Sequence, residues 1–122
     1  MVEGSPPTTL EQIDAERDRR LAHGFTADVG RVSVPVDTRN GADWINLIGL
    51  ALYAQKLVAD GHGTSTMAFR GADNRVYTLS AAEIVELGQQ AMAHKSMIYG
   101  KAWSLKDTAP IPADYQADAY WT

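Results

Sequence analysis

The chain of 122 residues contains no cysteine. That absence excludes disulfide bonds, thiolate zinc sites, iron–sulfur clusters and cysteine nucleophiles. A basic excess is also missing, since eleven lysines and arginines stand against fifteen aspartates and glutamates, a formal net charge of −4. Proteins that bind nucleic acid normally gather positive charge on one face, to displace counterions from the phosphates. We therefore expect no nucleic-acid partner.

Long apolar runs are missing as well. The longest, residues 48–54, is interrupted by Gly49, whereas a membrane-spanning helix needs about 20 apolar residues. The N-terminal residues include an acid, Glu3, where a secretory signal would carry basic residues. We expect a soluble protein without a targeting segment and without membrane insertion.

The length and composition predict one compact domain. Hydrophobic residues make up 45% of the chain and charged residues 21%, which is ordinary for a globular protein. We expect a flexible leader over residues 1–8, a single helical domain over residues 9–109 and a C-terminal arm over residues 110–122. Pro110 and Pro112 prevent a helix from continuing into the arm.

The first helix is predicted over residues 10–22. Thr9 and Gln12 form one of two overlapping capping boxes at its start, and Gly24 supplies a stop where a left-handed residue is needed. Acidic and basic side chains three or four positions apart predict a solvated charged face. The pairs are Asp14–Arg17, Glu16–Arg19 and Glu16–Arg20.

Residues 25–37 are predicted to be extended or irregular, with one short edge strand where three valines alternate around Pro35. A second helix is predicted over residues 39–59, capped by Asp37 or Thr38.

The second predicted helix is apolar on nearly every face. Such a helix must be covered on several sides, and a domain of this size has few elements to cover it. Two interpretations stay open. Part of the helix packs against another subunit, or the helix is central and enclosed by its own chain.

Two short runs of β-favouring residues around a four-residue loop predict a β-hairpin over residues 64–79. Ser80 and Glu83 then form a capping box, while Leu79 and Ile84 occupy the positions of a hydrophobic staple. The strand should pass directly into a third helix of about 25 residues, roughly 37 Å long. The predicted fold class is therefore mostly α with a small β-hairpin (α+β), with three helices, the last one long, and the hairpin between helices 2 and 3.

The three histidines have structural explanations. His23 follows a helix C-terminus, where an imidazolium meets the negative end of the dipole. His62, between two glycines, is interpreted as a turn residue, because no second histidine stands at ligand spacing from it. We expect His94, on the apolar stripe of the third helix, to be a satisfied core or interface histidine.

Three acids lie near the predicted hairpin: Asp60, Asp73 and Glu83. A glycan hydrolase would need two such carboxylates paired in a cleft, but each of these has a turn or capping explanation. We predict that the protein is not an enzyme and has no catalytic, cofactor-binding or metal-binding residues.

Several segments, taken in order, resemble an uncharacterised domain of unknown function common in tailed-bacteriophage tail-fibre and tail-associated proteins. The resemblance spans residues 11–121 and is carried by residues 15–20 (Ala-Glu-Arg-Asp-Arg-Arg), Gly24-Phe25, Asn40-Gly41-Ala42, Asp73-Asn74, residues 80–83 (Ser-Ala-Ala-Glu), His94, Leu105-Lys106 and Trp121. Two departures are Met67 and Phe69, where a hairpin tryptophan is usual, and three alternating valines between the first two helices.

The resemblance implies a component of a phage tail, or of a prophage-like particle, and implies no catalytic residues. We therefore expect a non-enzymatic structural protein of the tail or tail-fibre apparatus, made in the host bacterial cytoplasm and located in the virion tail. Its expected partners are other tail or fibre proteins and further copies of itself. The terminal aromatic residues of the arm indicate that it is pinned onto its own domain or onto a neighbour, and for a tail component we expect the leader and the arm to dock onto neighbouring subunits. The alternative is a tail-fibre assembly factor that is absent from the mature virion. The predicted packing or interface anchors are Trp44, Leu52, Tyr99, Trp103 and Trp121.

Overall fold

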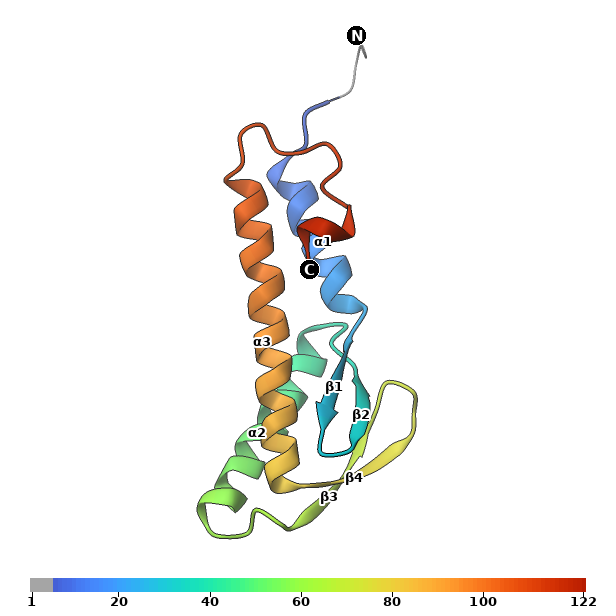
Figure 1. Ribbon diagram of the computed structural model, residues 1–122, viewed down its shortest axis with the longest axis vertical. Helices are drawn as coiled ribbons and strands as arrows, with labels where there is room; N and C mark the ends of the chain where they lie inside the picture. Colours follow the sequence, from blue (N-terminus) through green and yellow to red (C-terminus); the bar gives the residue numbers. More distant parts are fainter. Residues whose placement is uncertain (1–5) are drawn as a thin grey trace. The chain divides into compact units, whose positions relative to one another are not determined.

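The structure, a computed structural model, describes residues 6–122 as three helices, two antiparallel hairpins and a short 3₁₀ helix (Figure 1). The elements in chain order are α1 (Leu10–Ala22), β1 (Phe25–Val29), β2 (Val32–Val36), α2 (Gly41–Ala59), β3 (Thr66–Arg70), β4 (Val76–Ser80), α3 (Ala81–Lys106) and η1 (Asp118–Tyr120). The predicted fold class is confirmed. Residues 1–5 of the predicted leader lie outside the described residues.

The chain divides into two compact units. One unit is Ala22–His94, which contains both hairpins, α2 and the first part of α3. The other contains α1, the part of α3 from Lys95 onward and the C-terminal segment.

The strands β1 and β2 form a hairpin where the sequence predicted a single edge strand. Their register runs from Phe25 opposite Val36 to Val29 opposite Val32, around a turn in which Gly30 has a φ of +58°. One face of the hairpin is buried and consists of Ala27, Val29, Val34 and Val36. The prediction missed β1 although its signal was present, because Phe25, Ala27 and Val29 alternate with the polar Thr26 and Asp28 as in a half-buried strand.

The helix α2 begins two residues later than predicted, and its cap is Asn40 rather than Asp37 or Thr38. The side-chain oxygen of Asn40 accepts a hydrogen bond from the backbone N–H of Asp43 at 3.0 Å. Thr38 is buried before the helix begins. Asp43 in turn accepts a hydrogen bond from the backbone N–H of Arg39 at 2.9 Å. The prediction of Asp37 or Thr38 as the cap was wrong because Asn40 has the geometry of a capping residue.

The predicted hairpin between α2 and α3 is present, with β3 and β4 paired from Thr66 opposite Ser80 to Arg70 opposite Val76. The capping box that follows it is also confirmed. The backbone N–H of Ser80 donates to Glu83 Oε1 at 2.8 Å, and the backbone N–H of Glu83 donates to Ser80 Oγ at 3.1 Å. The strand β4 therefore passes into α3 without a loop.

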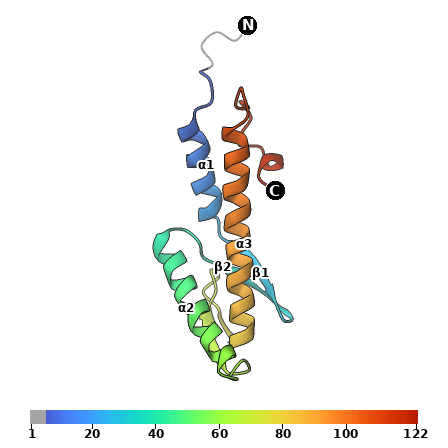
Figure 2. The ribbon, with the colours of Figure 1, turned by 90° about the vertical axis from the view of Figure 1, so that its left-hand side faces the viewer.

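Within the unit Ala22–His94, α2 lies against the first part of α3 (Figure 2). The two helices approach each other closely at Gly88, where an added Cβ would come within 2.8 Å of Ala51 Cβ. A methyl group has no room there, so Gly88 sets how near the two helices can lie. None of the helices in residues 6–122 is both long enough and apolar enough to cross a membrane.

Replacing Gly88 with alanine should lower the free energy of unfolding by about 1–3 kcal/mol, because the new methyl group must push α2 away from α3. Gly100→Ala on the same helix is the matched control, since nothing lies within 4 Å of the added Cβ. It should raise stability by about 0.5–1 kcal/mol through helix propensity. Urea denaturation followed by circular dichroism measures both changes. Equal changes in the free energy of unfolding for Gly88→Ala and Gly100→Ala would contradict the close approach of the helices at Gly88.

Candidate interaction surface

The helix α2 has a covered side and an uncovered side. The side chains buried within its own unit are Trp44, Leu47 and Ala54. On the other side, large apolar side chains face solvent: Ile45 is 72% exposed, Leu52 60% and Tyr53 59%. Contiguous exposed apolar surface of this kind usually marks a site of interaction.

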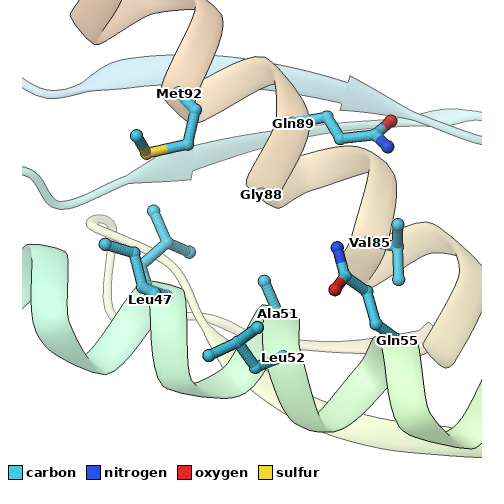
Figure 3. A pocket seen from close by; sticks show the side chains of 9 residues that line it. Leu47, Ala51, Leu52, Gln55, Val85, Gly88, Gln89 and Met92 are labelled. Atoms are coloured by element: carbon cyan, nitrogen blue, oxygen red, sulfur yellow. The ribbon is translucent and has the colours of Figure 1, made fainter.

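A groove runs between the uncovered side of α2 and the first part of α3 and has a volume of about 320 Å³ (Figure 3). The residues that line it are Leu47, Ile48, Ala51, Leu52 and Gln55 from α2, and Val85, Gly88, Gln89 and Met92 from α3. Two of these side chains, Gln55 and Gln89, carry amides, and the rest present hydrocarbon, thioether or backbone. The lining is apolar apart from two amides and contains no titratable side chain. It therefore suits the binding of another apolar surface better than acid–base catalysis.

The charged face predicted for α1 is solvated only in part, because Asp18 and Arg19 are exposed whereas Glu16 is buried. Glu16 is only 2% exposed, and its carboxylate is bound by Arg19 Nη2 at 2.5 Å and by Arg20 Nε at 2.7 Å. Arg20 also reaches the C-terminal segment, donating to the carbonyl oxygen of Gln116 at 2.8 Å and to Asp118 Oδ1 at 2.9 Å. The prediction was wrong for Glu16 and Arg20, because Glu16 is buried and Arg20 contacts residues almost a hundred positions away in the sequence.

Trp121 completes this cluster in the same unit. Its side chain has no exposed surface, and its indole N–H donates to the carbonyl oxygen of Tyr115 at 2.7 Å. The guanidinium of Arg20 lies 5.3 Å from the centroid of the indole ring, within range of a cation–π contact. The end of the arm is therefore held by its own chain, which is one of the two alternatives that its terminal aromatic residues indicated.

Tyr99 and Trp103 lie one turn apart on the later part of α3. The guanidinium of Arg17 lies 4.9 Å from the centroid of the Tyr99 ring, so α1 covers this side chain in part. Trp103 touches Tyr99 edge-on, with ring centroids 6.2 Å apart, but remains 59% exposed.

The five predicted anchors therefore do not form one site. Trp44 and Trp121 are buried packing residues, each in a different unit, and Leu52 and Trp103 are exposed. Neither the cluster around Glu16 nor the exposure of Ile45 was predicted from the sequence. A signal for Ile45 was present, because it stands seven positions before Leu52 and so falls on the same face of the helix.

His94 differs in part from its prediction. Its ring stacks on Phe25 with centroids 5.2 Å apart, as a core histidine would, but Nε2 is buried and has no hydrogen-bond partner among the described residues. Burial lowers the pKa of His94. His62 lies in a turn as predicted, with its backbone N–H donating to Leu57 at 2.7 Å and its carbonyl accepting from Ser65 at 3.0 Å.

The candidate acids all make local structural contacts. Asp60 pairs with Lys56 at 3.1 Å, Glu83 caps α3, and Asp73 accepts a hydrogen bond from the Tyr77 hydroxyl at 2.6 Å. That hydrogen bond from Tyr77 is the main reason that the pKa of Asp73 lies below its ordinary value. Across residues 6–122 there is no group of three or more histidine or acidic side chains placed to hold a metal ion.

Trp121→Ala should lower the free energy of unfolding by about 3–5 kcal/mol, because it empties a fully buried site. Trp103→Ala is the matched control and should lower it by less than about 1 kcal/mol, since it removes an exposed ring with one edge contact. Chemical denaturation monitored by circular dichroism compares the two variants. Similar losses would contradict the difference in burial.

The buried carboxylate of Glu16 should make stability depend on pH in the acidic range. The hydrogen bond from Arg19, helped by Arg20, holds the pKa of Glu16 below its ordinary value although burial opposes the shift. Because the folded pKa is lowered, this stabilisation is full above the unfolded value of about 4.3 and is lost as the pH falls through the folded pKa.

Glu16→Gln should therefore lower the free energy of unfolding at pH 7 by about 1.5–3 kcal/mol. It should also flatten the decline in stability below about pH 4.3. Glu11→Gln, an exposed acid in the first turn of the same helix, should cost less than about 1 kcal/mol at pH 7. Urea titrations between neutral and acidic pH make the comparison. An acidic decline as steep in Glu16→Gln as in the wild-type chain would rule out this role for Glu16.

Comparison with known proteins gives one match. Residues 6–120 match a protein family described as Domain of unknown function (DUF4376). No curated protein matches the chain, and no solved structure does so either.

Proposed function

The chain belongs to the family described as Domain of unknown function (DUF4376), and from that premise we propose that it is a non-enzymatic structural component of a phage tail or tail-fibre apparatus. It acts through protein–protein contacts, its partners are other tail or fibre proteins and further copies of itself, and it is located in the virion tail after synthesis in the host cytoplasm. The phage context rests on the resemblance carried by residues 15–20 and by the ordered segments that follow up to Trp121.

The observation that supports an interaction role is the uncovered apolar side of α2. Ile45 and Leu52 are both more than half exposed on a helix that has no charged residue between Asp43 and Lys56. Each Å² of apolar surface that is removed from water lowers the free energy by roughly 25 cal/mol. A partner that covers it recovers that free energy, so the surface suits a protein that works in an assembly.

The contacts of the acids also favour a role without catalysis. Asp60, Asp73 and Glu83 are each engaged in a cap, a turn or an ion pair. The groove beside α2 is lined by apolar and amide side chains. We therefore assign the groove to binding.

The same uncovered surface suits a second candidate, a tail-fibre assembly factor that binds the fibre transiently and leaves before the virion is complete. The two candidates share the binding surface and differ in where the protein ends up. Its amount in finished particles separates them.

Quantitative mass spectrometry of washed particles from the encoding phage or prophage should recover the protein in the copy number of a tail-ring or fibre component. A tail-tube protein serves as the reference for a true component, and an abundant host cytoplasmic protein measures contamination. Recovery at the level of the host protein, together with abundance in the infected-cell lysate, would contradict the structural role and favour the assembly factor.

A further inference from the structure

The strand β1 is attached to α3 within the unit Ala22–His94 (Figure 1). Gln90 makes the polar part of this attachment. Its side-chain amide accepts a hydrogen bond from the backbone N–H of Asp28 at 2.9 Å and donates one to the carbonyl oxygen of Asp28 at 2.7 Å. The amide therefore binds the edge of β1 as a neighbouring strand would. It also donates to Glu86 Oε1 at 3.3 Å, so both of its polar atoms have partners.

His94, one turn further along α3, makes the second contact with β1. Its ring stacks on Phe25, with the centroids 5.2 Å apart and the planes 12° apart. Nε2 of His94 is buried and has no hydrogen-bond partner among the described residues. Buried polar atoms nearly always have a partner, so one without a partner requires an explanation. The start of β1 is thus held by a polar ring in apolar surroundings.

The protonation state of His94 determines whether this contact is favourable. A neutral imidazole carries one proton, and with that proton on Nδ1 the buried Nε2 presents only a lone pair. An imidazolium carries a proton on each nitrogen, so Nε2 becomes a donor that faces no acceptor. Burial is the cause that lowers the pKa of His94 from its ordinary value. The stacked position therefore favours the neutral ring.

The acids on the elements around His94 are engaged elsewhere. Asp28 is the one acid on β1, and its carboxylate accepts a hydrogen bond from Ser33 Oγ at 2.6 Å. β2 carries no ionisable residue. On α3, the carboxylate of Glu86 accepts the hydrogen bond from Gln90. Neither acid is a cause of the shift in the pKa of His94, so neither compensates a positive charge on its ring.

The basic groups beside this contact offer no compensation either. His23 precedes β1, and Lys95 follows His94 directly in the chain. A positive charge on either residue repels a second positive charge on His94 and does not stabilise it. An imidazolium at this position therefore gains stability only by leaving Phe25 and reaching water.

From the stacked ring, the unpartnered Nε2 and the lack of a compensating acid, we propose that His94 is an acid-sensitive latch. The neutral ring holds the start of β1 on α3, and the protonated ring releases it. The contact between Gln90 and Asp28 involves an uncharged amide and backbone groups, so it persists, and the opening is local to the start of the hairpin. The latch needs no partner, so it stands or falls independently of the proposed function.

The direction of the pH dependence follows from the two states of the latch. The pKa of His94 is lower in the closed hairpin than in the open one, because only the closed hairpin buries the ring. The closed form is therefore fully favoured above about pH 6.5 and is weakened as the pH falls from there through the pKa of the closed form. Histidine changes its charge between about pH 5 and pH 8. The contribution of Glu16 is lost only below about pH 4.3, so this range isolates the latch.

The first test is a titration of the wild-type chain, followed through the nuclear magnetic resonance signals of the His94 ring. His94 should take up its proton at a lower pH in the folded chain than in the same chain unfolded in urea. Protonation at the same pH in both states, or at a higher pH in the folded chain, would overturn the proposal.

The second test is hydrogen exchange of the wild-type chain between about pH 8 and about pH 5. Protection factors are compared, because they remove the intrinsic pH dependence of exchange. Amides of β1 and β2 should lose protection severalfold over this range. Those of β3 and β4, the hairpin of the same unit that His94 does not join to α3, should keep theirs. Equal losses in the two hairpins, or none in β1 and β2, would contradict a latch at His94.

His94→Phe separates a latch from a residue that only packs. The new ring retains the ability to stack on Phe25 but takes up no proton, so the loss of protection in β1 and β2 at acidic pH should disappear. His62→Phe is the matched control, because His62 is an exposed turn residue of the same unit, and it should keep the wild-type pH dependence.

A loss of protection in His94→Phe as large as in the wild-type chain would overturn the proposal, since it would show that another group titrates. Far-ultraviolet circular dichroism shows whether each variant has folded. The titration and the exchange of the wild-type chain decide the question even where a variant does not fold.

Discussion

The close approach of α2 to α3 at Ala51 and Gly88 determines how the unit Ala22–His94 is built. A Cβ on Gly88 would lie 2.8 Å from Ala51 Cβ, so the two helices have no room for a side chain at this point. The buried face of α2 contains Trp44 and Leu47. The other side of α2 stays exposed at Ile45 and Leu52, and the groove lies beside it.

In the other unit the governing interaction is the burial of one carboxylate among arginines. Glu16 is removed from water and compensated by Arg19 and Arg20, and Arg20 carries the connection onward to Asp118 and to the ring of Trp121. A buried charge is expensive unless it is paired and hydrogen-bonded. This requirement fixes the position of the C-terminal segment on α1, and it explains why the segment stays on its own chain.

Local signals in the sequence were enough to predict most of the elements. In the capping boxes at Thr9 and Ser80, each of two residues three positions apart donates its backbone N–H to the side chain of the other. Both helices begin where those boxes predict. The first hairpin was only half predicted, although Phe25, Ala27 and Val29 alternate with two polar residues as a half-buried strand requires. The cluster around Glu16 could not be predicted, since Arg20, which binds its carboxylate, is itself held by residues 96 to 98 positions further along the chain. For the candidate surface, the all-round apolar pattern of α2 left two interpretations open, and only the exposure of Ile45 and Leu52 distinguishes its bare side from its packed side.

The central claim is that the bare side of α2 is covered by another chain when the protein works. Carbene footprinting of the intact chain, in dilute and in concentrated solution, tests it most directly because it reports the exposure of individual side chains. The account predicts that labelling of Ile45 and Leu52 falls as the concentration rises, while labelling of Trp103, which is 59% exposed and lies in the other unit, stays constant. Constant labelling of Ile45 and Leu52, or an equal fall at Trp103, would contradict it.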